Sequence, residues 1–387
     1  MSLTVIGLDG NPLPPGAAQA LAGAQLVLGA AHHLAAVPVP AGAEVLGPSE
    51  LDRLVGTSAA VVLASGDPGF FGVVRALRQR GLQPVVWPAR SSVSRAFARL
   101  GRSWDDVVVV SAHGSGRSLR RALNICRARP AVAVLTGPGA GAGEVSAGLA
   151  GWRRSVLVAE DLDGPQERVR RFAGGPVRDP HLVLTLADEH AVPSRGWIAG
   201  GEPVPPEAGW ALDEAEFSHR DGMITKAEVR ALVLARLAPG PGRLVWDVGA
   251  GSGSVGVECA RLGAAVIAVE RDSAQCARLV ANASAHRVDV RLVEGQAPAV
   301  LEELPEPDAV FVGGGGPAVV RAAARAAPRV VVALAAVDRL APCRTALRAE
   351  GHEVDGVQLT TSRFVELPGG SLRLAATNPV LVLWGRR

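Results

Sequence analysis

The chain has 387 residues, a length that favours two or three domains over one. Its net charge of +3 lacks the strong basic character typical of nucleic-acid-binding proteins, so we expect no nucleic-acid partner. No run of about eighteen apolar residues is free of charged or turn-forming residues, and the N-terminal MSLTVIGLDGNPLPPG does not resemble a signal peptide, so we expect a cytoplasmic protein without a membrane span.

The first half of the chain, residues 3–198, alternates short apolar runs with Ala/Arg-rich stretches of helical character. This alternation predicts an α/β domain with largely parallel strands. The predicted strands are Leu3–Gly7, Ala59–Ala64, Val107–Ser111, Val132–Thr136, Ser155–Ala159 and His181–Leu186.

A proline-rich segment, residues 199–212 (AGGEPVPPEAGWAL), is predicted to be a linker. Residues 213–387 then form a second α/β domain with an open sheet. Its strands are predicted at Arg243–Val248, Ala265–Glu270, Val288–Val293, Ala309–Val312, Val330–Leu334 and Val380–Trp384.

The cysteines and histidines of the chain are not spaced as metal ligands usually are. The four cysteines are scattered without a CxxC pair, and we expect buried free thiols. His32 and His33 are adjacent, so their side chains diverge and no third ligand is evident. We therefore predict no metal site.

A glycine-rich motif follows the first strand of the second domain: Asp247, Gly249, Gly251, Gly253 and Gly256 lie within DVGAGSGSVG. Such a turn lets the backbone approach a ligand, and the following helix presents free N–H groups. The spacing fits both a dinucleotide fingerprint and motif I of class I methyltransferases. An acid at the strand end is unfavourable beside a pyrophosphate but suits the cationic end of S-adenosylmethionine.

The ends of the next two predicted strands favour the methyltransferase interpretation. Glu270 is placed to accept hydrogen bonds from ribose hydroxyls, and Gly295 and Gln296 lie where this class contacts adenine. After the fourth strand, Gly313–Gly316 replace the Asn/Asp-Pro-Pro-aromatic segment of enzymes that methylate nucleic bases. A glycine loop leaves room for a large flat substrate.

The segment FSHRDGMITKAEVR at residues 217–230, followed by WDVGAGSGSVG, resembles the decarboxylating precorrin-6Y methyltransferase domain of cobalamin biosynthesis over residues 213–387. Gln296 stands where that family commonly has an acid. The resemblance implies that His219, Asp221 or Lys226 supplies the acid needed after decarboxylation, and that Thr225 contacts the cofactor.

Loops of the first half resemble those of the tetrapyrrole methylases, a class whose cofactor lies between two small α/β lobes. The matching segments are SGDPG at 65–69, PARSSVSRAF at 88–97, VSAHG at 110–114 and Thr136 with the following Gly-Pro. The implied cofactor contacts are Gly7, Gly66, Asp67, Pro68, Ser91, Ser92 and Thr136. The first loop departs from the family's G-x-G-P-G and reads Gly7-Leu-Asp-Gly-Asn-Pro.

Together the two halves resemble the bifunctional precorrin-6Y C5,15-methyltransferases. That resemblance implies two S-adenosylmethionine sites, a tetrapyrrole (precorrin) substrate and a homo-oligomer. The N-terminal domain would methylate C5, and the C-terminal domain would methylate C15 and decarboxylate the C12 acetate, giving precorrin-8. The substrate's carboxylates call for arginines, and the candidates considered are Arg75, Arg95, Arg117, Arg120 and Arg121.

Three alternatives stay open at this point. The chain could act on a cobalt-containing precorrin of the anaerobic pathway. It could be a class I RNA or protein methyltransferase fused to an inactive lobe. It could also be a non-catalytic tetrapyrrole-binding protein, although the intact Asp247–Gly253 loop speaks against that.

Overall fold

The computed structural model describes residues 3–57, 59–113, 116–162, 164–179, 181–187, 199–200, 209–220 and 222–387. The chain forms two compact units. The first contains Met1–Trp104, Ala133–Gly143 and Val156–Leu184, and the second contains Asp105–Val132, Glu144–Ser155 and Thr185–Arg387. The predicted domain boundaries at 198 and 213 stay a prediction, and most of the predicted linker lies outside the described residues.

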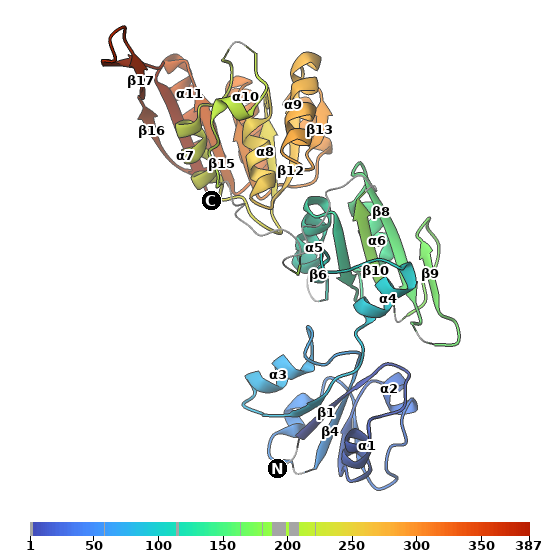
Figure 1. Cartoon of the computed structure of the whole chain (residues 1–387). Coiled ribbons are helices and arrows are strands. Elements are labelled where there is room, and N and C mark those ends of the chain that lie inside the picture. The colour runs from blue at the N-terminus through green and yellow to red at the C-terminus, as the bar shows by residue number, and fades with distance from the viewer. Residues whose placement is uncertain are drawn as a thin grey trace. The chain divides into compact units, whose positions relative to one another are not determined.

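The N-terminal sheet is parallel and has the order β3-β2-β4-β1-β5 (Figure 1). Its strands are β1 (Leu3–Leu8), β2 (Leu26–Leu28), β3 (Glu44–Leu46), β4 (Ala60–Ser65) and β5 (Val85–Trp87). The helices of residues 1–100 are α1 (Pro15–Ala22), α2 (Ala31–Ala35), α3 (Val73–Gln79), α4 (Ser92–Leu100), which contacts β9 (Arg168–Arg171) of the second sheet, and the 3-10 turn η1 (Leu51–Leu54). Val5 and Ile6 are fully buried in two different apolar clusters, as expected for a strand covered on both faces.

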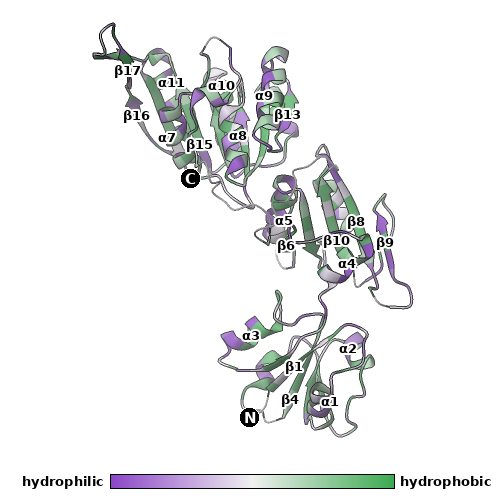
Figure 2. Ribbon diagram, in the orientation of Figure 1, coloured by the Kyte–Doolittle hydropathy of each residue, from purple (hydrophilic) through white to green (hydrophobic). Residues whose placement is uncertain are grey.

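A second sheet has the order β6-β7-β10-β8-β9, with β8 and β9 antiparallel. Its strands are β6 (Val108–Ser111), β7 (Ala131–Leu135), β8 (Arg154–Glu160), β9 (Arg168–Arg171) and β10 (His181–Ala187). Helices α5 (Gly116–Ala128) and α6 (Ala142–Gly148) follow β6 and β7 in the chain. Figure 2 shows the arginine-rich β9 as hydrophilic, which suits its position at the edge of the sheet.

The C-terminal sheet has the order β13-β12-β11-β14-β15-β19-β16. Its strands are β11 (Leu244–Val248), β12 (Ala265–Glu270), β13 (Arg291–Glu294), β14 (Ala309–Val312), β15 (Arg329–Leu334), β16 (Glu353–Leu359) and β19 (Val380–Arg386), and β17 (Ser362–Glu366) pairs separately with β18 (Leu372–Ala376). The helices are α7 (Ala227–Leu237), α8 (Ser254–Arg261), α9 (Ser273–Ala285), α10 (Gly316–Ala326) and α11 (Leu340–Ala349), with 3-10 turns η2 (Glu214–Glu216), η3 (Ala299–Glu303) and η4 (Val337–Arg339).

Alternate residues of β11 enter opposite cores of this sheet. Trp246 packs in the cluster that includes residues of α10 and α11, whereas Val245 packs in the cluster that includes residues of α7 and α8. Helices therefore cover both faces, and the α/β fold class is confirmed. The strand order reverses between β11 and β14, and ligands of open α/β sheets bind at such a switch point.

The longer apolar runs predict strands, and the structure has strands at these positions. The run predicted at Val288–Val293 is a strand only from Arg291, because the Val288 N–H bonds to Ala283 O at the end of α9. All four cysteines are buried free thiols, as expected. Among the described residues, no helix is both long and apolar enough to cross a membrane.

Candidate functional site

The turn after β11 is built from glycines that other residues could not replace without strain. Gly249, Gly251 and Gly253 all have left-handed φ angles, at 70°, 56° and 77°. A Cβ on Gly253 would lie 2.6 Å from the Leu279 side chain, whereas a Cβ on Gly251 would meet nothing within 4 Å. The turn is therefore closely packed on one side and open at Gly251, where a ligand can approach the backbone.

Asp247 organises the start of α8. Its side chain is buried, and Oδ2 accepts the Gly256 N–H at 2.8 Å. Burial, with a smaller contribution from the nearby Glu270 carboxylate, raises the pKa of Asp247 to about 7. The structure thus places Asp247 beneath the glycine turn, and its predicted role beside a cationic ligand stays a prediction.

Glu270, the last residue of β12, binds the turn that follows β11. Its Oε2 accepts the Gly251 N–H at 2.8 Å, and its Oε1 accepts the backbone N–H groups of Arg271 and Asp272 at 2.8 and 3.0 Å. The Gly295 N–H donates to the Glu270 carbonyl at 2.9 Å, and Gln296 is exposed beside it. The residues predicted to bind cofactor at three strand ends therefore meet along one edge of the sheet.

The segment before α7 carries the predicted acids. His219 Nδ1 accepts the Gly222 N–H at 3.2 Å, and Lys226 Nζ donates to the Gly222 carbonyl at 3.4 Å. The Thr225 carbonyl accepts a hydrogen bond from Arg230 at 2.5 Å. Asp221 lies outside the described residues. The backbone of Gly222 therefore holds the side chains of His219 and Lys226 at the same turn.

Asn282, a buried residue of α9 that sequence reasoning missed, links this segment to the glycine turn. Its Oδ1 accepts the Ser218 N–H at 2.7 Å, while its Nδ2 donates to the carbonyls of Ser218 and Ser252 at 2.9 and 2.8 Å. A side chain that satisfies three backbone groups fixes both chains against each other. No local motif marks Asn282, because its partners lie far away in sequence.

In the N-terminal lobe, Gly7 lies against the SGDP loop. A Cβ at Gly7 would come within 2.1 Å of the Gly66 carbonyl oxygen and 2.7 Å of the Ala89 nitrogen. The Gly66 N–H donates to Leu8 O at 2.7 Å, and Asp67 Oδ1 accepts the Gly69 N–H at 2.8 Å. The loops at the ends of β1, β4 and β5 therefore converge through backbone contacts.

Serines begin the helix beside these loops. Ser91 is the N-cap of α4 and accepts the Ser94 N–H at 3.1 Å, and Ser92 is the first helical residue. Pro68 is buried. Thr136 follows β7 in the second sheet, where its hydroxyl donates to His181 O at 2.8 Å. The roles predicted for these residues toward a cofactor stay predictions.

The unusual first loop has its own ion pair. Asp9 Oδ2 accepts from Arg90 Nε at 2.8 Å, and Asp9 Oδ1 accepts the Asn11 N–H at 3.1 Å. Burial raises the pKa of Asp9, but the Arg90 and Asn11 hydrogen bonds outweigh it and hold that pKa below its usual value. The loop that departs from G-x-G-P-G is thus held to the segment after β5, a contact that sequence reasoning missed.

Two of the arginines considered as carboxylate partners already have partners within the protein. Arg120 pairs with Asp308 at 3.1 Å, and Arg95 donates to the carbonyls of Asp9 and Leu162 at 3.3 and 3.0 Å. The first partners of these two side chains are therefore protein groups, and the role predicted for them toward a substrate stays a prediction.

Models of two families match the two halves of the chain. The description "Tetrapyrrole (Corrin/Porphyrin) Methylases" applies to residues 6–175 and "Precorrin methyltransferase domain" to residues 215–379. A probable cobalt-precorrin-6B C(15)-methyltransferase (decarboxylating) of Pyrobaculum calidifontis is 34% identical over 189 residues, which cover 46% of this chain and 96% of that protein. The chain belongs to the precorrin methyltransferase family.

Longer relatives extend the similarity. The precorrin-6Y C(5,15)-methyltransferase [decarboxylating] of a Sinorhizobium species is 42% identical over 276 residues, 67% of this chain. The match spans 63% of that relative's length. A crystal structure of the C-terminal domain of precorrin-6Y C5,15-methyltransferase from Rhodobacter capsulatus is 35% identical, covers 48% of this chain and 98% of the solved chain, and has a TM-score of 0.41.

Proposed function

We propose that the chain methylates precorrin-6Y at C5 and C15 and decarboxylates its C12 acetate, giving precorrin-8. The N-terminal domain would act at C5 and the C-terminal domain at C15 and C12, with one S-adenosylmethionine consumed per methyl group. Self-association, a cytoplasmic location and the absence of a nucleic-acid partner belong to the same proposal.

The observation that carries the proposal is the presence of two differently built glycine loops in one chain. One is the glycine turn after β11, clamped by Glu270 and open at Gly251. The other is the convergence of Gly7 and Gly66 with the segment after β5. Two methyl-transfer sites of different construction match a substrate that is methylated twice.

The residues of the C-terminal site fit S-adenosylmethionine, which supplies an electrophilic methyl group when bound. The open backbone at Gly251 admits the ligand, and Glu270 and Gln296 offer acceptors along the same edge. Methyl transfer breaks the C–S bond and forms a C–C bond to an electron-rich ring carbon. The protein's task is mainly to align the two groups and exclude water.

Decarboxylation needs a proton as well as placement. The C–C bond to the carboxylate breaks, CO₂ leaves, and the electron pair passes into the conjugated ring. A proton then converts the former acetate into a methyl group. To supply this proton His219 would have to be an imidazolium, which the Gly222 N–H donated to Nδ1 opposes, whereas the Lys226 ammonium at the same turn has protons to donate.

The test is mass spectrometry of the purified chain incubated with precorrin-6Y and S-adenosylmethionine. The proposal expects two added methyl groups and the loss of one CO₂. One methyl group with decarboxylation would assign activity to the C-terminal domain alone. An unchanged precorrin-6Y would overturn the proposed substrate.

A cobalt-containing precorrin is the second candidate. It is favoured by the similarity to the Pyrobaculum protein, whose name specifies cobalt-precorrin-6B. The same incubation with cobalt-precorrin-6B in parallel distinguishes the two, because the preferred substrate has the higher kcat/KM. Methylation of bulk RNA without corrin activity would instead support the class I RNA methyltransferase alternative.

A further inference from the structure

A cavity of about 310 Å³ lies at the carboxyl ends of β14 and β15, on the other side of the switch point from β12 and β13. Part of its wall is the glycine turn at Gly313 and Gly314. This turn touches the cofactor loop, because a Cβ on Gly249 would lie 3.0 Å from the Gly314 nitrogen. A group held in the cavity would therefore be adjacent to the turn proposed to bind the methyl donor.

The walls of the cavity are apolar apart from the backbone and one side chain. Val312, Val320, Val332 and Leu334 contribute buried hydrocarbon. Among the residues that the structure describes, no hydroxyl, amide or acidic side chain lines it. Such a lining suits an aliphatic arm.

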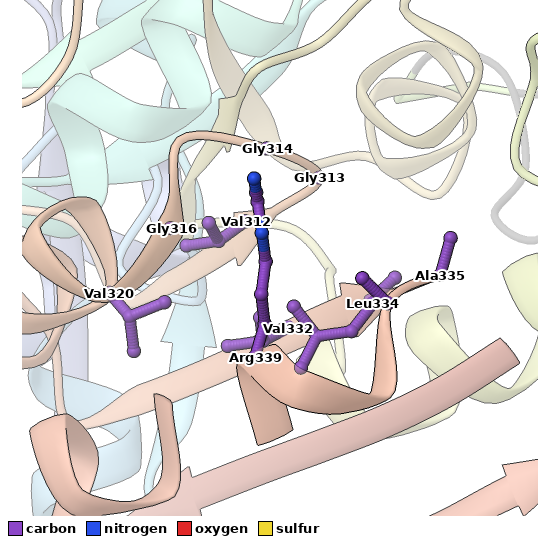
Figure 3. A pocket seen from close by; sticks show the side chains of 11 residues that line it. Val312, Gly313, Gly314, Gly316, Val320, Val332, Leu334, Ala335 and Arg339 are labelled. Carbon is purple, nitrogen blue, oxygen red and sulfur yellow. The ribbon is translucent and has the colours of Figure 1, made fainter. Parts of the chain in front are cut away.

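Of the described residues that line the cavity, Arg339 alone is charged. It ends η4, is exposed, and Figure 3 shows its side chain extending toward the Gly313–Gly314 turn. In the part of the chain that the structure describes, no acidic side chain forms an ion pair with Arg339. A guanidinium at an apolar cavity is suited to bind a carboxylate through paired hydrogen bonds.

We infer that this cavity binds a carboxylate-bearing side chain of the substrate, with Arg339 as the group that holds the carboxylate. The inference rests on the proposed function and assigns the substrate-orienting cation of the C-terminal site. Arg339 would hold a carboxylate that the product retains. A tight ion pair would stabilise the leaving carboxylate and so oppose the loss of CO₂.

The test compares Arg339→Gln with wild type in the full chain, using precorrin-6Y and S-adenosylmethionine. Loss of the charged pair should raise the KM for precorrin-6Y about 10- to 100-fold, with a smaller change in kcat. The dissociation constant for S-adenosylmethionine and the ratio of CO₂ released to C15 methylation should stay at their wild-type values. Arg348→Gln, on an exposed position near the end of α11, is the matched control.

A second variant tests the cavity independently of the charge. A side chain at Gly314, which lines the cavity, would meet nothing within 4 Å and requires no left-handed backbone, so Gly314→Val should fold and narrow the cavity. It should raise the KM for precorrin-6Y in the same way.

Several results would overturn the inference. An unchanged KM in both variants would do so while leaving the proposed function intact. Weaker S-adenosylmethionine binding in Arg339→Gln would assign Arg339 to the cofactor, and an altered CO₂ ratio would place it at the leaving carboxylate. A wild-type enzyme inactive on precorrin-6Y would overturn both the function and the subsite.

Discussion

Arg230 Nε donates to Glu258 Oε1 at 2.5 Å, and both residues are fully buried. Glu258 also accepts the N–H groups of Ala211 and Leu212, and Arg230 donates to the Thr225 carbonyl. The pair therefore ties both ends of residues 211–225 to helices α7 and α8. This segment contains the predicted acid His219, so the buried pair supports the site without forming part of it.

Removing one partner of this pair should destabilise the C-terminal domain strongly. Glu258→Ala leaves the Arg230 charge buried and unpaired, which costs about 3–5 kcal/mol in comparable cases. Urea unfolding followed by tryptophan fluorescence measures the loss. The control is Glu350→Ala, which breaks the exposed pair with Arg325 and should cost at most about 1 kcal/mol. Equal effects of the two variants would contradict the prediction.

Asp247 should make stability depend on pH. Its pKa is raised from 3.8 to about 7, so the folded state keeps a proton that the unfolded state releases between these values. The stability from this group is fully present below pH 3.8 and is lost as pH rises through about 7. Asp247→Asn retains an acceptor for the Gly256 N–H but cannot titrate, so it should remove this dependence.

The measurement compares urea midpoints at pH 5 and pH 8 for wild type and Asp247→Asn. Wild type should lose more stability than the variant over that interval. Parallel changes in the two proteins would show that other groups govern the pH dependence.

Gly251 offers a test of the C-terminal ligand site that spares the fold. Its side chain would point into open space, so Gly251→Leu should fold, at a cost of about 1–2 kcal/mol for the left-handed backbone. It should abolish S-adenosylmethionine binding at this site and C15 methylation, while C5 methylation of a C15-methylated intermediate continues. Gly251→Ala carries the same backbone cost with little bulk and should retain partial activity. Full C15 activity in Gly251→Leu would refute the site.

The parts of the fold that could be predicted are those encoded locally. Apolar runs of five or six residues, such as Ala265–Glu270, were recognised as strands. The three-residue strands β2, β3 and β5 carry too little pattern, and β16 alternates exposed and partly buried residues without an apolar run. These strands form because neighbouring strands of the sheet provide a partner with which to pair.

The candidate site likewise contains residues that could be predicted from the sequence and residues that could not. Glycine positions such as Gly249 and Gly253 were predictable because a turn with left-handed φ angles demands glycine locally. Asn282 and Arg339 could not be predicted, because the backbone groups that Asn282 contacts and the cavity beside Arg339 come together only when the chain folds. An arginine in an arginine-rich sequence carries no signal of its own.

The N-terminal site can be tested through Gly7. Gly7→Ala would place a Cβ 2.1 Å from the Gly66 carbonyl oxygen, so the SGDP loop must shift away from the end of β1. C5 methylation should therefore fall by at least about 100-fold, because displacements of about 1 Å in positioning groups have effects of that size. C15 methylation and decarboxylation should continue, because Gly7 lies in a different compact unit from the C-terminal site.

The control is Gly42→Ala, whose added Cβ would meet nothing within 4 Å and which should keep both activities. Mass spectrometry of the products separates the outcomes. Retention of C5 methylation in Gly7→Ala would place that chemistry elsewhere, and loss of both activities would indicate that the two sites depend on each other.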